Sequence, residues 1–173
     1  MSSLLGPTLF SMSKCYQELN HVQVCRLVRS KRNSIWIAKG DIAMRLARCG
    51  CARLAVACEG EPMQVSVCHC LECQRRTGSA FGVQARFPRA NVTVEGPYKT
   101  YERVGEGGLW ARYHFCPDCG STVFYENEDV PDAFAIPVGA FADPGFPPPT
   151  RSIFEKRRHE WVKVCEEGID CQP

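Results

Sequence analysis

Seven of the twelve cysteines in this 173-residue chain lie in three tightly spaced groups. The groups are Cys49-Gly50-Cys51, Cys68-His69-Cys70-Leu71-Glu72-Cys73, and Cys116-Pro117-Asp118-Cys119 followed by Gly120. Thiolates are favoured zinc ligands, and a gap of two residues lets both sulfurs of one turn point at the same ion. A glycine after the last cysteine permits the left-handed backbone that such a turn often needs. The residue types and their spacing therefore predict metal binding.

The number of grouped sulfurs predicts how they are shared between ions. A closed structural zinc takes four protein ligands, whereas a reactive zinc keeps three and leaves one position open to water or a substrate. Seven sulfurs divide into one set of each kind, so we expect two zinc ions per chain. The set of four, named here the four-cysteine site, is Cys49, Cys51, Cys116 and Cys119. The set of three, named the cysteine trio, is Cys68, Cys70 and Cys73.

Each group also has a simpler interpretation. Cys116 and Cys119 could form a thioredoxin-type redox pair, but that motif opens a helix, whereas residues 121–125 are β-rich. The trio could be cysteines buried at the end of a strand, because free cysteines pack as small apolar side chains. The Cys49 and Cys51 spacing is common by chance and gains weight only from the total of seven. Zinc remains the favoured interpretation for all three groups.

The segments that must position these cysteines are mostly short β-rich runs. From Arg53 onward, apolar positions alternate and Gly or Pro separates most of the runs, which predicts an all-β fold of antiparallel strands. The first two runs, around Leu54–Cys58 and Val65–Val67, form a hairpin signal. The later runs are Phe81–Phe87, Val92–Glu95, Tyr98–Glu102, Leu109–Phe115, Thr122–Tyr125, Phe134–Val138 and Ser152–Phe154. The buried face of the first run is expected to include Cys58.

The amino-terminal segment differs in charge from the rest of the chain. Residues 1–48 carry eight Lys or Arg and two acidic residues, whereas residues 49–173 carry thirteen and seventeen. We therefore expect a basic, poorly structured or partly helical extension over residues 1–44, a zinc-binding domain over 45–164 and a short tail over 165–173. A basic leader poor in acidic residues is also compatible with a mitochondrial transit peptide.

Composition excludes several classes of protein. Apolar residues make up 45% and charged residues 23%, which is typical of a globular chain. Charged residues interrupt every candidate apolar run, so we expect no membrane span. A net charge of +2 is too small to suggest nucleic acid as a partner by itself, and the acidic balance of residues 49–173 weighs against it. The poor match to a secretory signal, together with metal-type cysteine spacing, favours the cytoplasm.

The order of the motifs resembles the glutathione-dependent formaldehyde-activating enzyme family, which also includes centromere protein V. The resemblance covers roughly residues 48–161, and it is most specific over Cys68–Phe81 and 112–121. It implies coiled antiparallel sheets and the same division into a structural site of four cysteines and a reactive trio. Two departures are Ala52, where the family usually has glycine, and Ser152, where it usually has histidine.

The resemblance implies a zinc-dependent carbon-sulfur lyase acting on a glutathione–aldehyde adduct. Cys68, Cys70 and Cys73 would form the site of chemistry, and Arg75 or Arg76 could pair with substrate carboxylates, because guanidinium binds carboxylate through two hydrogen bonds. The alternative for the arginines is a solvated surface pair. Two other functions stay open, namely a non-catalytic zinc-stabilised binding module and a carrier of glutathione or zinc. Among the histidines, His69 is expected at the surface, with general acid work as its alternative, and His114 is expected to be structural.

Overall fold

The structure is a computed structural model that describes residues 43–105, 107–164 and 168–172. The expected basic extension lies almost entirely outside these ranges, so its predicted partial helix does too. The described part starts one residue before the first strand, which begins at Met44. Within these ranges, every helix is too short or too polar to cross a lipid bilayer.

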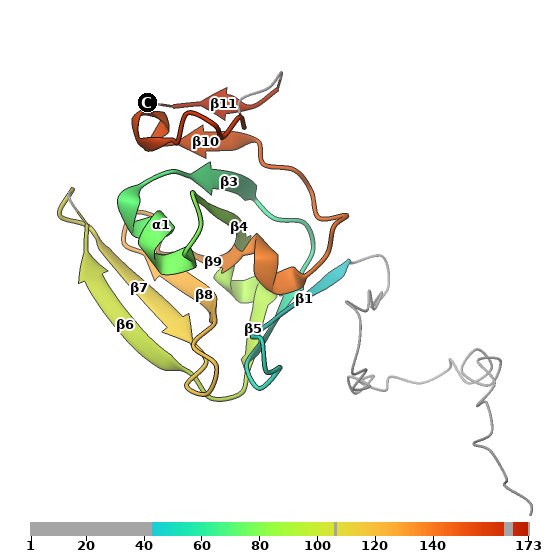
Figure 1. Cartoon of the computed structure of the whole chain (residues 1–173). Coiled ribbons are helices and arrows are strands. Elements are labelled where there is room, and N and C mark those ends of the chain that lie inside the picture. Colours follow the sequence, from blue (N-terminus) through green and yellow to red (C-terminus); the bar gives the residue numbers. More distant parts are fainter. Residues whose placement is uncertain (1–42, 106, 165–167, 173) are drawn as a thin grey trace, which may run out of the picture. The chain divides into compact units, whose positions relative to one another are not determined.

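The described part of the chain forms two β-sheets, in keeping with the strands that the alternating pattern predicted (Figure 1). The small sheet has the order β1-β2-β5, and its antiparallel strands are β1 (Met44–Arg48), β2 (Ala55–Glu59) and β5 (Val92–Glu95). The large sheet has the order β11-β10-β3-β4-β9-β8-β7-β6. Its strands are β3 (Gln64–Cys68), β4 (Gly82–Pro88), β6 (Lys99–Val104), β7 (Trp110–Phe115), β8 (Thr122–Asn127), β9 (Ala133–Pro137), β10 (Arg151–Ile153) and β11 (Asp170–Cys171). The all-β fold class is therefore confirmed.

Two pairings in the large sheet are parallel rather than antiparallel. β10 runs parallel to β3, with Arg151 opposite Ser66 and Ile153 opposite Cys68, and β11 runs parallel to β10. Parallel neighbours need a long crossover connection, and here the chain between β3 and β10 crosses the rest of the sheet before it returns. Hydrophobic alternation specifies which face a side chain occupies but not the direction of the neighbouring strand. The expected antiparallel pairing holds for the other strand pairs of both sheets, and this edge is the exception.

Both sheets contribute to one apolar core. Leu54, Val56 and Cys58 are fully buried, which confirms the predicted buried face of the first run. They share a cluster with side chains of the large sheet such as Phe87 and Ile136. Burial of alternating side chains from two sheets removes apolar surface from water and is the main source of stability in such folds.

Among the described residues there is one α-helix, α1 (Leu71–Thr77), which begins inside the segment of the cysteine trio, where the sequence pattern indicated no helix. The side chain of Cys70 caps its first turn, because Cys70 Sγ accepts a hydrogen bond from the backbone N–H of Cys73 at 3.3 Å. Gly78 ends the helix in the left-handed conformation, with φ of 64°. Three short 3₁₀ helices complete the described elements: η2 (Arg89–Asn91), η3 (Val138–Phe141) and η4 (Glu155–Arg157).

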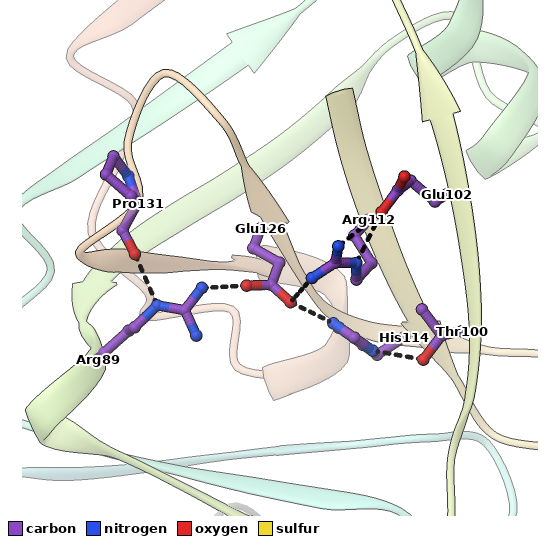
Figure 2. Close-up of polar contacts among 7 residues, drawn as sticks. All are labelled: Arg89, Thr100, Glu102, Arg112, His114, Glu126 and Pro131. Carbon is purple, nitrogen blue, oxygen red and sulfur yellow. Dashed lines mark hydrogen bonds and ion pairs between the residues drawn. The ribbon is translucent and has the colours of Figure 1, made fainter. Parts of the chain in front are cut away.

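Figure 2 shows an ionic network on β7 and β8. It lies on the face opposite to Tyr113 and Tyr125, the two tyrosines that Arg76 of α1 covers. Glu126, which is buried, pairs with Arg89 and Arg112 and accepts a hydrogen bond from His114 Nε2 at 3.0 Å. His114 Nδ1 in turn lies 3.1 Å from the hydroxyl of Thr100. Burial lowers the pKa of His114. These contacts tie strands β6, β7 and β8 to η2, and they are consistent with the structural role expected for His114.

Candidate metal centres

The four-cysteine site brings together sulfurs from distant parts of the chain. All four sulfur atoms lie within 4.8 Å of one another. Cys51 Sγ is 3.5 Å from Cys49 Sγ and 3.6 Å from Cys116 Sγ. A tetrahedral zinc with bonds of about 2.3 Å places its sulfurs about 3.8 Å apart. The four cysteines could therefore hold a metal ion, and the structure brings the two cysteine pairs together.

Tight turns hold these sulfurs in place. Cys49 follows β1 directly, and its sulfur accepts a hydrogen bond from the backbone N–H of Leu54 at 3.2 Å. Gly120, in the turn between β7 and β8, has φ of 73° and donates its N–H to the carbonyl of Cys116. Ala52 adopts φ of 60°, the left-handed conformation that glycine tolerates better. The turn is therefore kept despite the departure from the family pattern.

The cysteine trio also forms a compact cluster, with its three sulfurs within 4.8 Å of one another. Cys68 is the last residue of β3, Cys70 caps α1 and Cys73 lies in its first turn. Hydrogen bonding to Cys70 raises the pKa of Cys68, whereas hydrogen bonds from Cys68 and Cys73 lower the pKa of Cys70. The cluster therefore favours at least one thiolate, which is the form that binds metal. Three sulfurs leave a fourth coordination position to another ligand.

His69, between two cysteines of the trio, is completely buried, so the expectation that it lies at the surface is wrong. Its Nε2 atom is 3.2 Å from the hydroxyl of Ser152 and 3.4 Å from a carboxylate oxygen of Glu155. Burial lowers its pKa. Ser152 occupies the position where the family usually has histidine, and it is fully buried on β10. His69 and Ser152 thereby fix β10 beside the cysteine trio.

The two arginines of α1 point in different directions. Arg75 pairs with Glu72 on the exposed side of the helix, and its side chain is 69% exposed. Arg76 lies over the rings of Tyr113 and Tyr125, with its guanidinium carbon 5.6 and 5.1 Å from their centroids. Two of its nitrogen atoms, Nε and Nη2, are buried without a hydrogen-bond partner in the part of the chain that the structure describes. Of the two predicted substrate contacts, Arg76 is the one held beside the trio.

Sequence reasoning missed three residues next to the trio. Tyr113 and Tyr125 are buried under Arg76, and they lie opposite each other on β7 and β8. Arg103 of β6 stacks on Tyr113, and its Nε atom is 3.9 Å from the Glu72 carboxylate. The strand pattern placed Tyr113 and His114 on opposite faces. The alternation along the strand does not indicate which of its two faces packs against α1, because the sequence pattern did not predict that helix.

Comparison with known proteins gives the family. Residues 44–157 match the model of the family described as glutathione-dependent formaldehyde-activating enzyme. The chain belongs to this family. The match includes both cysteine sites and ends at the last residue of η4.

Other comparisons are more distant. A solved structure, the crystal structure of a Rhodobacter sphaeroides protein that was a Northeast Structural Genomics target, is 17% identical. The alignment covers 74% of this chain and 99% of that chain, with a TM-score of 0.45. Comparison with curated proteins finds no significant match.

Proposed function

We propose that this member of the formaldehyde-activating family is a zinc-dependent carbon-sulfur lyase. It would interconvert glutathione and formaldehyde with their adduct, S-hydroxymethylglutathione. The observation that carries the proposal is the cysteine trio, a three-ligand cluster with the unpaired Arg76 guanidinium beside it. A structural zinc site would need a fourth protein ligand, and the trio has none among the described residues.

The two cysteine sites would have different tasks. The four-cysteine site would bind one zinc ion and join the end of β1 to the turn between β7 and β8. The cysteine trio would bind the second. Zinc, when bound there, would supply a Lewis acid that favours the thiolate form of a substrate thiol. Arg76 would bind a carboxylate of the same substrate, since its buried N–H groups lack partners.

The proposed reaction is balanced without a redox partner. In the direction of synthesis, the substrate sulfur forms a bond to the aldehyde carbon, and the carbonyl oxygen takes up the proton that the thiol releases. A free thiol with a pKa near 8.5 is only about 3% thiolate at pH 7. Complete deprotonation would therefore accelerate the addition by at most about thirtyfold. Orientation by Arg76 and the trio would add to that modest gain.

An exchange measurement at equilibrium tests the proposal. Glutathione and formaldehyde react unaided, so the exchange rate with wild-type protein is compared with the rates for Cys70→Ala and for Arg76→Gln. We expect Cys70→Ala to return the exchange to the uncatalysed rate and Arg76→Gln to reduce it about tenfold or more. Arg75→Gln is the matched control, because that side chain points into solvent. Exchange no faster than the Cys70→Ala background would refute the lyase. Glutathione binding without acceleration would instead indicate a carrier.

The three thiols of the cysteine trio also support a proposal for the cellular compartment. Three sulfurs within 4.8 Å of one another would form disulfides readily under oxidising conditions without metal. A reducing compartment keeps them available for zinc, so we place the activity in the cytoplasm.

A further inference from the structure

Buried polar atoms without hydrogen-bond partners collect on one face of the large sheet. Six buried side-chain nitrogen or oxygen atoms on this face have no hydrogen-bond partner within the described ranges, and they belong to Arg76, Gln84, Arg86, Asn127 and Arg151. Such atoms are rare in folded proteins, because each one left unpaired costs about 1–3 kcal/mol. Their concentration on one face indicates that a polar ligand or water supplies the missing hydrogen bonds.

Strand register places these residues beside the cysteine trio. Side chains directly opposite each other on neighbouring strands share a face of the sheet. Ser66 of β3 lies opposite both Gln84 and Arg151. Cys68, two residues further along β3, lies opposite Gly82. A Cβ atom at Gly82 would be only 3.1 Å from the Arg76 guanidinium, so α1 packs on this face. The buried polar atoms without hydrogen-bond partners therefore lie along the same face of the sheet, starting beside the cysteine trio.

A cavity of about 510 Å³ opens over this part of the sheet. Its lining includes Ser66, Arg86, Asp129, Arg151, Ile153 and Phe154. The volume lies within the usual range for small-molecule sites. Phe154 has φ of 59°, a strained conformation for a side chain of this kind, and such strain is frequently found at functional sites. Ile153 lies opposite Cys68, so the cavity reaches the strand next to the trio.

The charges in the cavity favour an anion. Arg86 is partly buried and has no ion pair in the described part of the chain, and its Nε atom is one of the unpaired atoms. Arg151 donates to the side chain of Gln172, and its Nε atom is 3.8 Å from the carboxylate of Asp170, beyond hydrogen-bond distance. Asp129 is the one acidic side chain in the lining. The lining therefore carries two arginines against one carboxylate, and no ion pair joins Arg86 to an acidic side chain among the described residues.

We propose that this cavity is a carboxylate subsite, in which Arg86, with Arg151, binds the acidic end of a peptide-like thiol. The inference rests on the proposed function for the identity of the ligand. Arg86 lies four positions along β4 from Gly82, which is opposite Cys68, and four positions are about 13 Å of strand. A short peptide with an extended side chain spans this distance. The subsite would make the protein select acidic thiols over neutral thiols of the same size.

Calorimetric titration of the zinc-loaded, full-length protein tests the subsite separately from the reaction. S-methylglutathione is the probe, because its sulfur is blocked and its carboxylates are free. We expect Arg86→Gln to weaken its binding at least tenfold, and Arg75→Gln to leave it unchanged. Methyl esterification of the carboxylates should weaken binding to wild type at least as much, because it also removes the carboxylate proposed for Arg76. Arg86→Gln should then bind the ester no more weakly than wild type does, since esterification has already removed the interaction that Arg86 makes.

The titration distinguishes failure of the subsite from failure of the proposed lyase reaction. If Arg86→Gln binds S-methylglutathione as tightly as wild type, or if wild type binds neither this probe nor glutathione, the subsite is refuted. If the subsite behaves as expected but no exchange is accelerated, the lyase fails and the subsite stands. Thermal unfolding verifies that the variants are folded. If Arg86→Gln does not fold, Arg151→Gln replaces it. We expect that variant also to bind S-methylglutathione at least tenfold more weakly than wild type.

Discussion

Removal of Cys116 should unfold the protein, whereas removal of Cys70 should not. Cys116 is fully buried and belongs to the four-cysteine site. That site joins Cys49, at the end of the small sheet's first strand, to a turn of the large sheet. Cys70 belongs to a site whose ligands lie within six consecutive residues. Only the first site restricts how distant parts of the chain are arranged.

The magnitude follows from the length of chain that the metal closes. Between Cys49 and Cys116 the separation is 67 residues, from 116 minus 49. A cross-link over a loop of that length removes about 4 kcal/mol of unfolded-chain entropy in the disulfide model. The zinc–thiolate bonds add to this, because structural zinc binds small peptides with about 10–16 kcal/mol. Typical domains are stable by only about 5–15 kcal/mol, so Cys116→Ala should leave little or no folded protein.

The matched variants have smaller expected effects. Cys70→Ala removes the side-chain cap of α1, which should cost about 1 kcal/mol, and one zinc ion. Cys58→Ala removes a buried sulfur outside both sites, which should also cost about 1 kcal/mol with no loss of zinc. Zinc content by mass spectrometry and urea unfolding report both quantities for each variant. Equal loss of stability from Cys116→Ala and Cys70→Ala, or an unchanged zinc content in Cys116→Ala, would refute the division into a structural and a reactive site.

Three further predictions concern other parts of the chain. A chain that starts at Met44 should keep its zinc content and melting temperature, because both cysteine sites lie downstream; an earlier melt would show that residues 1–43 pack on the domain. Arg76→Gln should raise the KM for glutathione more than Arg75→Gln does, as measured by initial-rate kinetics corrected for the uncatalysed reaction. Glu126→Gln should cost about 1–3 kcal/mol at pH 7 in urea unfolding, since it removes the buried carboxylate that pairs with Arg89 and Arg112 and accepts a hydrogen bond from His114.

The pH dependence of the Glu126→Gln effect follows from the same network. Burial alone would raise the pKa of Glu126, but hydrogen bonds from Arg89 and His114 outweigh it and lower the pKa. A folded-state pKa below the unfolded value of 4.5 stabilises the fold above that pH. The difference in unfolding free energy between wild type and Glu126→Gln should therefore shrink as the pH falls below about 4.5. A difference that stayed constant down to pH 3 would contradict the argument.

Local spacing in the sequence was sufficient to predict the cysteine sites and the fold class. The sulfurs of a short turn are held close by a few backbone angles, so their proximity follows from the intervening residues alone. The alternation that predicted the buried positions Leu54, Val56 and Cys58 is likewise a property of one strand. The count of ligands predicts the pairing of Cys49 and Cys51 with the later cysteines, and in the structure the four sulfurs lie within 4.8 Å of one another.

The residues that surround the cysteine trio depended on the tertiary structure. Parallel pairing of β10 with β3 buries His69 against Ser152, which comes 83 residues later in the chain, and it aligns Arg151 with Ser66. Packing of α1 on Gly82 turns Arg76 toward the sheet and leaves its neighbour Arg75 in solvent. A shift of one residue in strand register would move every side chain of that strand to the other face. Which polar groups meet in the cavity was therefore decided by strand order and register, which arise from packing of the whole domain rather than from any one segment.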